Sequence, residues 1–246
     1  RGAPDLHLHA YSPMEVVNGA ARSAMSIRDF LIAVKEAGVN SLPGTAAEIL
    51  DDDVRWLLTK GKLPAAQWVE VVTTAHRIGL PTTSTMMYGH VDAPHHWVGH
   101  LRLLAEIQRE TGGFTEFVPL PFVHMASPIY LQRQARRGPT FRETVLLHAI
   151  ARIAYHGLID NIQVSWVKIG VDGARQLLRS GCNDLGGTLM DENISRAAGA
   201  AHGQGMTRDA FLEMVQPLGR SLRQRTTTYG RVDGATRGEG AVLTTA

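Results

Sequence analysis

A chain of 246 residues carries 25 lysines and arginines against 23 aspartates and glutamates, so its formal charge at neutral pH is +2. This balance excludes the clustered basic surface of a nucleic-acid-binding domain, and a hydrophobic content of 44% excludes disorder over most of the chain. The single cysteine, Cys182, excludes an internal disulfide, a cysteine-rich zinc site and a cysteine-ligated iron–sulfur cluster within these residues.

The chain shows no targeting pattern. No stretch reaches the roughly 18 consecutive apolar residues of a membrane span, and the first residues lack the charged-then-apolar order of a signal peptide. We therefore expect a cytoplasmic location. Because the first residue is Arg1 rather than methionine, we also expect a processed, cloned or partial chain.

Short apolar runs alternate with longer segments of helical period, which is typical of repeated βα units. Ser26 with Asp29 predicts a helix start and Gly38 its end, while Pro64 and Gly79 bound the next helix. In chain order the sequence predicts strands at 5–10, 39–43, 81–87, 114–120 and 161–167. Helices are expected directly after residue 45 and at 27–37, 64–78, 95–110, 141–156 and 171–180.

Five strands with intervening helices fit either a doubly wound α/β sheet or part of a β/α barrel. A complete eight-stranded barrel usually needs about 250 residues, so the count favours a barrel that lacks its first units. From residue 226 the composition shifts to Thr, Arg, Gly and Ala without periodicity. We expect a folded region over 1–225 and a disordered tail over 226–246.

The first candidate site lies on the first predicted strand. Strand alternation places His7 and His9 on one face, and an H-x-H pattern resembles the zinc site of amidohydrolase-like barrels. His90 and His124 are available as further ligands, but residues 161–168 contain no strand-end carboxylate. Two hydrogen-bonded histidines without a metal explain the same pattern, and both interpretations stay open.

A second candidate follows the next strand, where Pro-Gly and a predicted helix start offer backbone N–H groups to an anionic or polar ligand. Gly44 and Thr45 form this turn, and Glu48 is placed to accept hydrogen bonds from a ribose or an amine. A simple turn with a glutamate in the first helical turn is the alternative.

Two further polar segments are candidate ligand sites. Residues 82–85 carry four successive hydroxyls, including Thr83 and Thr85, and the same strand ends at His90. The glycine-rich segment 181–190 contains Asn183 and Asp184, which suit sugar hydroxyls or an amide, although a long turn explains it equally well. No dinucleotide or P-loop pattern accompanies these segments.

The ordered set of motifs resembles one family. The motifs are His-Leu-His-Ala-Tyr-Ser-Pro-Met-Glu at 7–15, Leu-Pro-Gly-Thr-Ala-Ala-Glu at 42–48, Thr-Met-Met-Tyr-Gly-His at 85–90, Ser-Trp-Val-Lys at 165–168 and Asn-Asp-Leu-Gly-Gly-Thr at 183–188. They resemble the deazaflavin-forming radical S-adenosylmethionine enzymes, in particular the tyrosine-using, C-terminal part of 7,8-didemethyl-8-hydroxy-5-deazariboflavin (FO) synthase. Menaquinone-pathway radical enzymes of the futalosine cyclase type share much of the pattern.

The resemblance implies a partial radical-SAM β/α barrel whose missing first units bind a 4Fe-4S cluster through three cysteines outside this chain. S-adenosylmethionine on the cluster would yield a 5′-deoxyadenosyl radical that acts on L-tyrosine. The 4-hydroxybenzyl group would then be joined to 5-amino-6-(D-ribitylamino)uracil, and a partner radical-SAM module, fused upstream, would close the ring. The isolated chain is expected to be inactive.

The resemblance also implies roles for the candidate residues. The cofactor-binding set is Gly44, Thr45 and Glu48; the catalytic set, facing the barrel interior, is His7, His9 and Glu15; the ribityl-binding set is Thr83, Thr85, His90, Asn183 and Asp184. No metal ligand is assigned, and Cys182 is interpreted as a small core residue. A zinc-dependent amidohydrolase-like barrel and a non-catalytic ligand-binding module remain the alternatives.

Overall fold

The computed structural model describes residues 5–232 and, as backbone, 242–245. Its strands are β1 (Leu8–His9), β2 (Val39–Ser41), β3 (Thr82–Tyr88), β4 (Phe114–Pro121), β5 (Asp184–Gly187), β6 (Leu222–Arg225) and β7 (Val242–Thr245). Its longer helices are α1 (Pro13–Arg22), α2 (Ile27–Glu36), α4 (Ala65–Arg77), α5 (Pro94–Thr111), α7 (Phe141–Ala154) and α8 (Trp166–Arg179). Shorter helices are α3 (Asp52–Leu58), α6 (Pro128–Leu131), α9 (Ile194–Ala197), α10 (Arg208–Val215) and the 3₁₀ turn η1 (Gln216–Leu218). Among the described helices, none combines the length and the apolar character that a membrane crossing requires.

The strands before β6 form a parallel array. β1 pairs with β2 and β3 pairs with β4, both in parallel. Parallel bridges join Leu42 to Thr82, Phe117 to Ile162 and Gln163 to Asp184, which links the array from β1 to β5. None of the sheets in the described part of the chain closes on itself. The structure is therefore mixed α/β with an open parallel arrangement.

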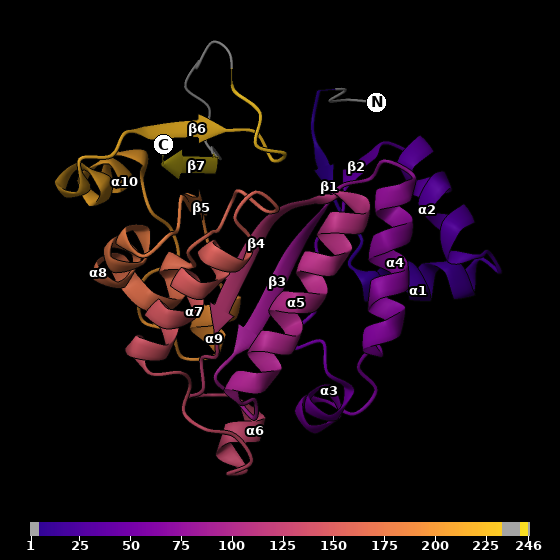
Figure 1. The fold of residues 1–246 in the computed structure, drawn as a ribbon, viewed down its shortest axis with the longest axis horizontal. Coiled ribbons are helices and arrows are strands. Elements are labelled where there is room, and N and C mark those ends of the chain that lie inside the picture. The colour runs from indigo at the N-terminus through magenta and orange to yellow at the C-terminus, as the bar shows by residue number, and fades with distance from the viewer. Residues whose placement is uncertain (1–4, 233–241, 246) are drawn as a thin grey trace.

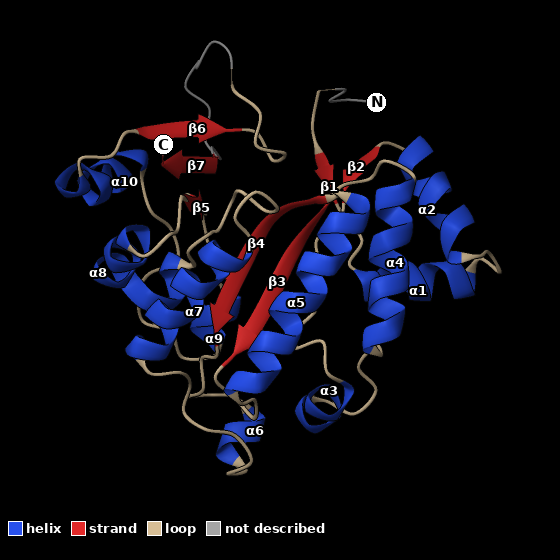
Figure 2. Ribbon diagram, in the orientation of Figure 1, coloured by secondary structure: helices blue, strands red, loops and turns tan. Residues whose placement is uncertain are grey.

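Helices cover one side of this array (Figures 1 and 2). α4, α5 and α7 run beside the strands, as βα connections require, and α1 and α2 pack at the β1 end. The larger core cluster joins β3 and β4 to α5, α7, α8 and α10 through buried side chains such as Phe117, Leu104 and Leu177. A second cluster, which includes Val16, Leu31 and Val71, fixes α1, α2 and α4.

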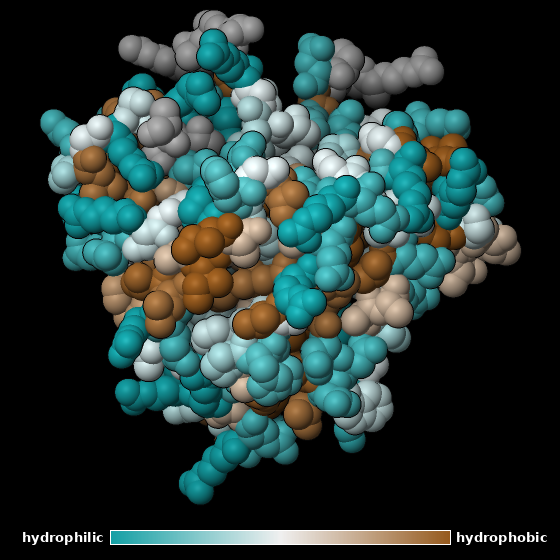
Figure 3. Space-filling view, viewed as in Figure 1, coloured by the Kyte–Doolittle hydropathy of each residue, from teal (hydrophilic) through white to brown (hydrophobic). Residues whose placement is uncertain are grey.

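Part of the surface helix layer is apolar. Figure 3 shows hydrophobic side chains gathered over α5 and α7, and α7 exposes Leu146, Ile150 and Ile153. These three side chains recur at helical spacing on the face of α7 that does not carry its buried residues.

The C-terminal strands lie at the opposite end of the array from the carboxyl ends of β3 and β4. β7 pairs antiparallel with both β5 and β6, and Figure 1 shows β6 near the start of β4. Residues 226–232, which the sequence assigned to a disordered tail, form a turn closed by the Thr226 N–H to Gly230 carbonyl bond. Residues 233–241 and 246 of that expected tail lie outside the described residues.

Most predicted elements are confirmed to within a few residues, with three corrections besides that of the expected tail. The helix expected directly after residue 45 begins instead at Asp52, where the Asp51 side chain accepts the Val54 N–H. The prediction missed α1 although its signal is local: Ser12, Pro13 and Glu15 form a capping box with proline at the first position.

The third correction concerns residues 161–190. The expected strand at 161–167 is short, because only the bridges at Ile162 and Gln163 are formed and a helical turn starts at Trp166. Gly170, with φ 72°, separates this turn from the predicted helix. The segment 181–190, expected as a loop, contains β5, because Asp184 and Leu185 are fully buried against the array.

Candidate functional site

His9 on β1 and His7 just before it both contact the hydroxyl of Ser41 on β2. His7 Nε2 lies 2.7 Å and His9 Nδ1 lies 2.6 Å from Ser41 Oγ, and Ser41 is buried. The parallel register that pairs His9 with Ser41 creates this contact. A hydroxyl has one proton to donate, so Ser41 donates to one imidazole and accepts from the other. The three groups therefore form a chain along which a proton can move.

Partial burial, and then the proximity of His7, lower the pKa of His9 below its ordinary value of 6.5. A lowered pKa favours the neutral imidazole at pH 7, which is the form that accepts a proton. The predicted pair His7 and His9 is thus brought together, and Ser41 is the partner that sequence reasoning missed.

The zinc hypothesis for His7 and His9 lacks a complete ligand set. Within residues 5–232 no group of three or more His, Cys, Asp or Glu side chains is placed to hold a metal ion. A catalytic zinc site needs three protein ligands, and here both imidazoles turn to Ser41.

Glu15 has a structural partner of its own. Its Oε2 accepts the backbone N–H and the hydroxyl of Ser12, each at 2.7 Å, and the side chain is exposed at the start of α1. These hydrogen bonds hold the pKa of Glu15 below its ordinary value. The geometry explains Glu15 as a helix cap, and its catalytic role stays a prediction.

Replacing Glu15 by glutamine should leave the free energy of unfolding within about 0.5 kcal/mol, since glutamine also completes a capping box. Alanine at the same position should lower it by about 0.5–1 kcal/mol. Urea unfolding followed by circular dichroism measures both. Equal losses for the two variants would contradict the capping role, whereas loss of turnover in E15Q at unchanged stability would support a catalytic one.

Gly44 lies against β3 rather than at a helix start. Its N–H donates to Thr83 Oγ1 at 2.9 Å, and its carbonyl accepts from Trp68 Nε1 at 3.1 Å and Thr85 Oγ1 at 3.3 Å. A Cβ on this residue would come within 2.2 Å of the Thr83 carbonyl oxygen, so only glycine fits. The backbone polar groups of Gly44 are consequently engaged within the protein.

The segment after Gly44 borders a cavity. Thr45 and Ala46 line a cavity of about 370 Å³ together with Ser12, Lys62 and other residues of α1 and the loop after α3. Glu48 pairs with Lys62 Nζ at 2.6 Å, and its carbonyl accepts the Met87 N–H near the end of β3. The buried Arg55 donates to the Leu63 carbonyl at 2.8 Å and also to the Ala47 carbonyl, which holds this segment in place.

The four hydroxyls of residues 82–85 all have internal partners. Thr83 and Thr85 bond the backbone of Gly44, as described above. Ser84 donates to the Glu116 carbonyl at 2.6 Å, and Thr82 lies 2.9 Å from His76 Nε2. The run of hydroxyls therefore ties β3 to its neighbours, and contact with a ligand stays a prediction.

His90 is buried in the turn after β3. Its Nδ1 accepts the Val91 N–H at 2.8 Å and its Nε2 lies 2.9 Å from the Met87 carbonyl, which fits a neutral ring protonated at Nε2. Desolvation lowers its pKa despite the nearby Asp92. Both ring nitrogens are occupied, so His90 stabilises the turn in this conformation.

Asn183 and Asp184 lie at the amino end of β5, whereas Glu48 and His90 lie near the carboxyl end of β3. Asn183 Oδ1 accepts from Arg152 and from the Ile162 N–H, each at 2.9 Å. The structure thus divides the predicted ribityl-binding residues between two ends of the parallel array.

Asp184 belongs to a buried cluster that also contains Glu116, Gln163, Arg225 and Tyr229. Arg225 Nη2 lies 2.5 Å from Asp184 Oδ2 and 3.4 Å from Glu116 Oε2. The Tyr229 hydroxyl is hydrogen-bonded to Glu116 Oε2 and Asp184 Oδ2, and Gln163 Nε2 donates to Glu116 at 3.0 Å. Burial and then the charge of Asp184 raise the pKa of Glu116 to about 7, so the two carboxyl groups share a proton as the pH falls below about 7.

A family model described as the CofH/MqnC C-terminal region matches residues 111–236, about half of the chain. This chain belongs to the CofH/MqnC C-terminal family. The match begins at the end of α5 and includes the carboxyl cluster of Glu116, Asp184 and Arg225. His7, Ser41 and His9 lie before it.

Relatives of this family member extend the similarity to nearly the whole chain. "FO synthase" of Nocardia farcinica is 63% identical over 95% of this chain, and "FO synthase" of Streptomyces coelicolor is 60% identical over 93%. The "5-amino-6-(D-ribitylamino)uracil--L-tyrosine 4-hydroxyphenyl transferase" of Methanothermobacter thermautotrophicus is 50% identical over 94%. The chain spans 27%, 26% and 63% of these relatives, so it corresponds to a C-terminal part of longer proteins.

Several residues of these sites carried no signal that sequence reasoning used. Ser41 directly precedes the 42–48 motif, but nothing in the local sequence pairs it with His7 and His9. Arg225 and Tyr229 lie at and beyond the boundary of the expected tail. Glu116 is the one residue whose sequence context indicates a buried partner, because an acidic side chain inside an apolar strand needs a group to pair with.

Proposed function

We propose that this chain is the tyrosine-using, C-terminal part of a radical S-adenosylmethionine enzyme of the FO synthase type. The complete enzyme joins the 4-hydroxybenzyl group of L-tyrosine to 5-amino-6-(D-ribitylamino)uracil. The observation that carries this proposal is the 50% identity, over 94% of the chain, to a protein named as the uracil–tyrosine 4-hydroxyphenyl transferase. The relatives' names favour this activity over the menaquinone-pathway alternative, and the cytoplasmic location stays a prediction.

We further infer that the parallel array is part of a β/α barrel. β1 is an edge strand among the described residues, where Leu8 is 41% exposed, and Leu6, two residues before the strand, is 64% exposed. Exposed leucines on a strand edge are typical of a surface that another strand covers. Strands from the remaining length of the complete protein would pair with β1, and the longer relatives are consistent with an upstream partner module.

The residues of this chain do not fit a 4Fe-4S cluster. Its single cysteine, Cys182, is buried, and desolvation raises the pKa of its thiol to about 12, so the thiolate that a cluster requires is disfavoured. We therefore assign the cluster ligands to another part of the complete protein and derive no step through the cluster.

The cavity beside Thr45 fits part of S-adenosylmethionine, since small-molecule sites commonly occupy roughly 300–1,000 Å³. Bound there, S-adenosylmethionine supplies the 5′-deoxyadenosyl group for radical chemistry. Thr45 lines the cavity and offers a hydroxyl. Glu48 does not line it but pairs with Lys62, which does, and its carboxylate would be the acceptor for ribose hydroxyls or an amine. Gly44 contributes by allowing the close approach of this segment to β3.

The chain His7–Ser41–His9 is the candidate for proton transfer during the reaction. His9, whose pKa is lowered, accepts a proton from the substrate side, and Ser41 passes a proton between His9 Nδ1 and His7 Nε2. Contact of Thr83, Thr85, His90, Asn183 and Asp184 with the ribityl chain would require each to exchange an internal hydrogen bond for one to the ligand.

Replacing Ser41 by alanine in the complete polypeptide should reduce product formation by roughly tenfold or more, because proton-transfer groups contribute on the order of 10²–10⁴-fold. The pH profile of kcat should also move, since His9, whose pKa is lowered, then lacks the hydroxyl that it shares with His7. Ser84→Ala, which removes an equally buried hydroxyl away from the imidazoles, is the matched control. Equal losses in both variants, with unchanged pH profiles, would assign Ser41 to structure alone.

The proposed activity is tested with the complete polypeptide under anaerobic, reducing conditions. Mass spectrometry should detect the uracil adduct only when S-adenosylmethionine, L-tyrosine and 5-amino-6-(D-ribitylamino)uracil are all present. A folded, cluster-loaded enzyme that leaves tyrosine unchanged would overturn the proposal. Stoichiometric zinc that is lost on replacing His7 or His9 would favour the amidohydrolase alternative instead.

A further inference from the structure

The outer face of α7 is apolar, although it lies on the surface of the helix layer. Leu146, Ile150 and Ile153 are 46%, 49% and 77% exposed, and Figure 3 shows hydrophobic side chains gathered over this helix. The opposite face of α7 carries its buried residues, among them Leu147 and Ala151. A helix with apolar side chains all round is typically buried on every side. One face of α7 is therefore uncovered in the described part of the chain.

The neighbouring helix α5 shows that an apolar outer face is not a general property of this layer. At the same spacing along its surface, α5 carries the exposed and charged residues Arg102, Glu106 and Arg109. The two helices pack against each other and both run beside the strands (Figure 1). A contiguous apolar surface beside charged residues is typical of a protein–protein contact.

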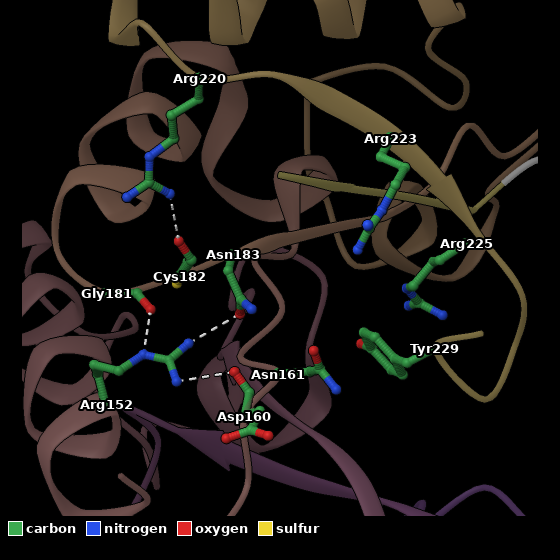
Figure 4. Close-up of a pocket in the computed structure, with 10 residues that line it drawn as sticks. All are labelled: Arg152, Asp160, Asn161, Gly181, Cys182, Asn183, Arg220, Arg223, Arg225 and Tyr229. Carbon is green, nitrogen blue, oxygen red and sulfur yellow. Dashed lines mark hydrogen bonds between the residues drawn. The ribbon is translucent and has the colours of Figure 1, made fainter. Parts of the chain in front are cut away.

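The long basic side chain next to this face does not shield it. Arg152 directly precedes Ile153, but Figure 4 shows its guanidinium group turned toward the start of β5. There it donates to the Gly181 carbonyl at 2.7 Å, the Asp160 carbonyl at 2.9 Å and Asn183 Oδ1 at 2.9 Å. A long basic side chain can cover apolar surface with its methylene groups, and these hydrogen bonds direct that of Arg152 elsewhere.

Completion of the barrel would leave the outer face of α7 uncovered. α7 has α5 on one side and α8 on the other, so it lies within the helix layer and not at its end. Additional strands would pair with β1, and their helices would extend the layer from that end. A partner for the outer face of α7 therefore comes from outside this barrel.

The lengths of the relatives indicate such a partner. The chain spans 63% of the Methanothermobacter protein but 27% of the Nocardia protein, so the Nocardia protein is more than twice as long. It therefore contains an additional segment longer than the whole Methanothermobacter protein. A segment of that length is sufficient for a further folded module.

The size of the apolar face favours a linked module over a second copy of the chain. Three side chains of one helix cover much less than the roughly 800 Å² per partner that a stable complex of separate proteins buries. A module on the same polypeptide is present at an effective concentration on the order of millimolar, so a smaller surface is sufficient to hold it.

We propose that the face formed by Leu146, Ile150 and Ile153 is the docking surface for the upstream radical-SAM module of the complete polypeptide. The proposal rests on the proposed function, because it takes the complete polypeptide to be a two-module enzyme of the FO synthase type. The upstream module contributes an apolar surface of its own, since three exposed aliphatic side chains offer no charge or hydrogen bond for recognition.

Photo-cross-linking of the complete polypeptide tests this docking. Ile153→p-benzoylphenylalanine introduces a photoreactive group at the most exposed position of the face. Irradiation should form cross-links within a single chain, and mass spectrometry of the digested product should locate them in the upstream module. Leu57→p-benzoylphenylalanine, at a 62% exposed position on α3, is the matched control and should form no cross-link to that module.

A second substitution shows whether the apolar contact holds the modules together. Added to the photoreactive variant, Ile150→Glu should lower the cross-link yield about tenfold, because an unpaired carboxylate in an apolar contact is strongly unfavourable. Leu57→Glu in the same background should leave the yield unchanged. Both glutamate variants should still form the uracil adduct, because Ile150 and Leu57 are exposed and lie outside the proposed sites.

Three results would overturn the docking proposal. They are the absence of cross-links to the upstream module, cross-links between two chains, and an unchanged yield in I150E. The adduct assay judges the proposed function separately. Adduct formation without the upstream cross-link would overturn the docking alone, whereas the cross-link without adduct formation would overturn the radical activity alone.

Discussion

Replacing Arg225 by methionine should lower the free energy of unfolding by about 3–5 kcal/mol, the usual effect of removing one partner from a buried ion pair. Asp184 is fully buried and Glu116 nearly so, and Arg225 is the cation within 2.5 Å and 3.4 Å of their oxygens. Without it, Tyr229 and Gln163 alone would face the remaining charge. Urea unfolding at pH 7, followed by circular dichroism, measures the loss.

Arg223→Met provides the control for this experiment. Arg223 lies two residues away on β6 and is exposed, so its replacement removes the same charge and leaves Arg225 in place beside Asp184 and Glu116. We expect R223M to change the free energy of unfolding by no more than about 0.5–1 kcal/mol. Similar losses for R225M and R223M would show that the buried pair contributes little.

The stability of the wild type relative to Glu116→Gln should fall as the pH rises from about 4.5 to about 7. Glu116 titrates near 4.5 when unfolded and near 7 when folded, so the folded state binds the proton more tightly. The stability from that proton is fully present below pH 4.5 and is lost as the pH passes 7. Its size is on the order of 3 kcal/mol.

The wild type has to be compared with the variant because the buried histidines change the stability with pH in the opposite direction to Glu116. Desolvation lowers the pKa of His76 and His148 to about 4 and that of His100 to about 3. Their contribution is present above pH 6.5 and is lost as the pH falls through those values, in both proteins alike. Parallel stability curves for wild type and E116Q between pH 4.5 and 7 would contradict the shared proton.

Local signals explain why most helices and strands were predictable. Ser26 with Asp29 begins α2 as expected, and Gly112, in the left-handed conformation, ends α5. Cys182 was expected in the core and is buried there. Such signals act over a few residues, which are adjacent in the chain whatever the rest of the protein does.

The missed features depend on partners far along the chain. The glycines of β5 predict a turn, yet a strand forms there and its Asp184 is stabilised by Arg225, which lies 41 residues later. Tyr229 reaches Glu116 across 113 residues. No local sequence pattern predicts these contacts, because they form only when β6 has folded back to the start of β4.

The sequence by itself determined the family, the alternation of strands and helices, and the absence of cluster-forming cysteines from this chain, because each depends on residue identity and order. Only the tertiary structure decided how the polar candidates are used. It joined His7 and His9 through Ser41, engaged the hydroxyls of β3 internally and moved Asn183 and Asp184 to the amino end of the array. The physical reason is that a buried polar group takes whichever partner folding brings within hydrogen-bond distance.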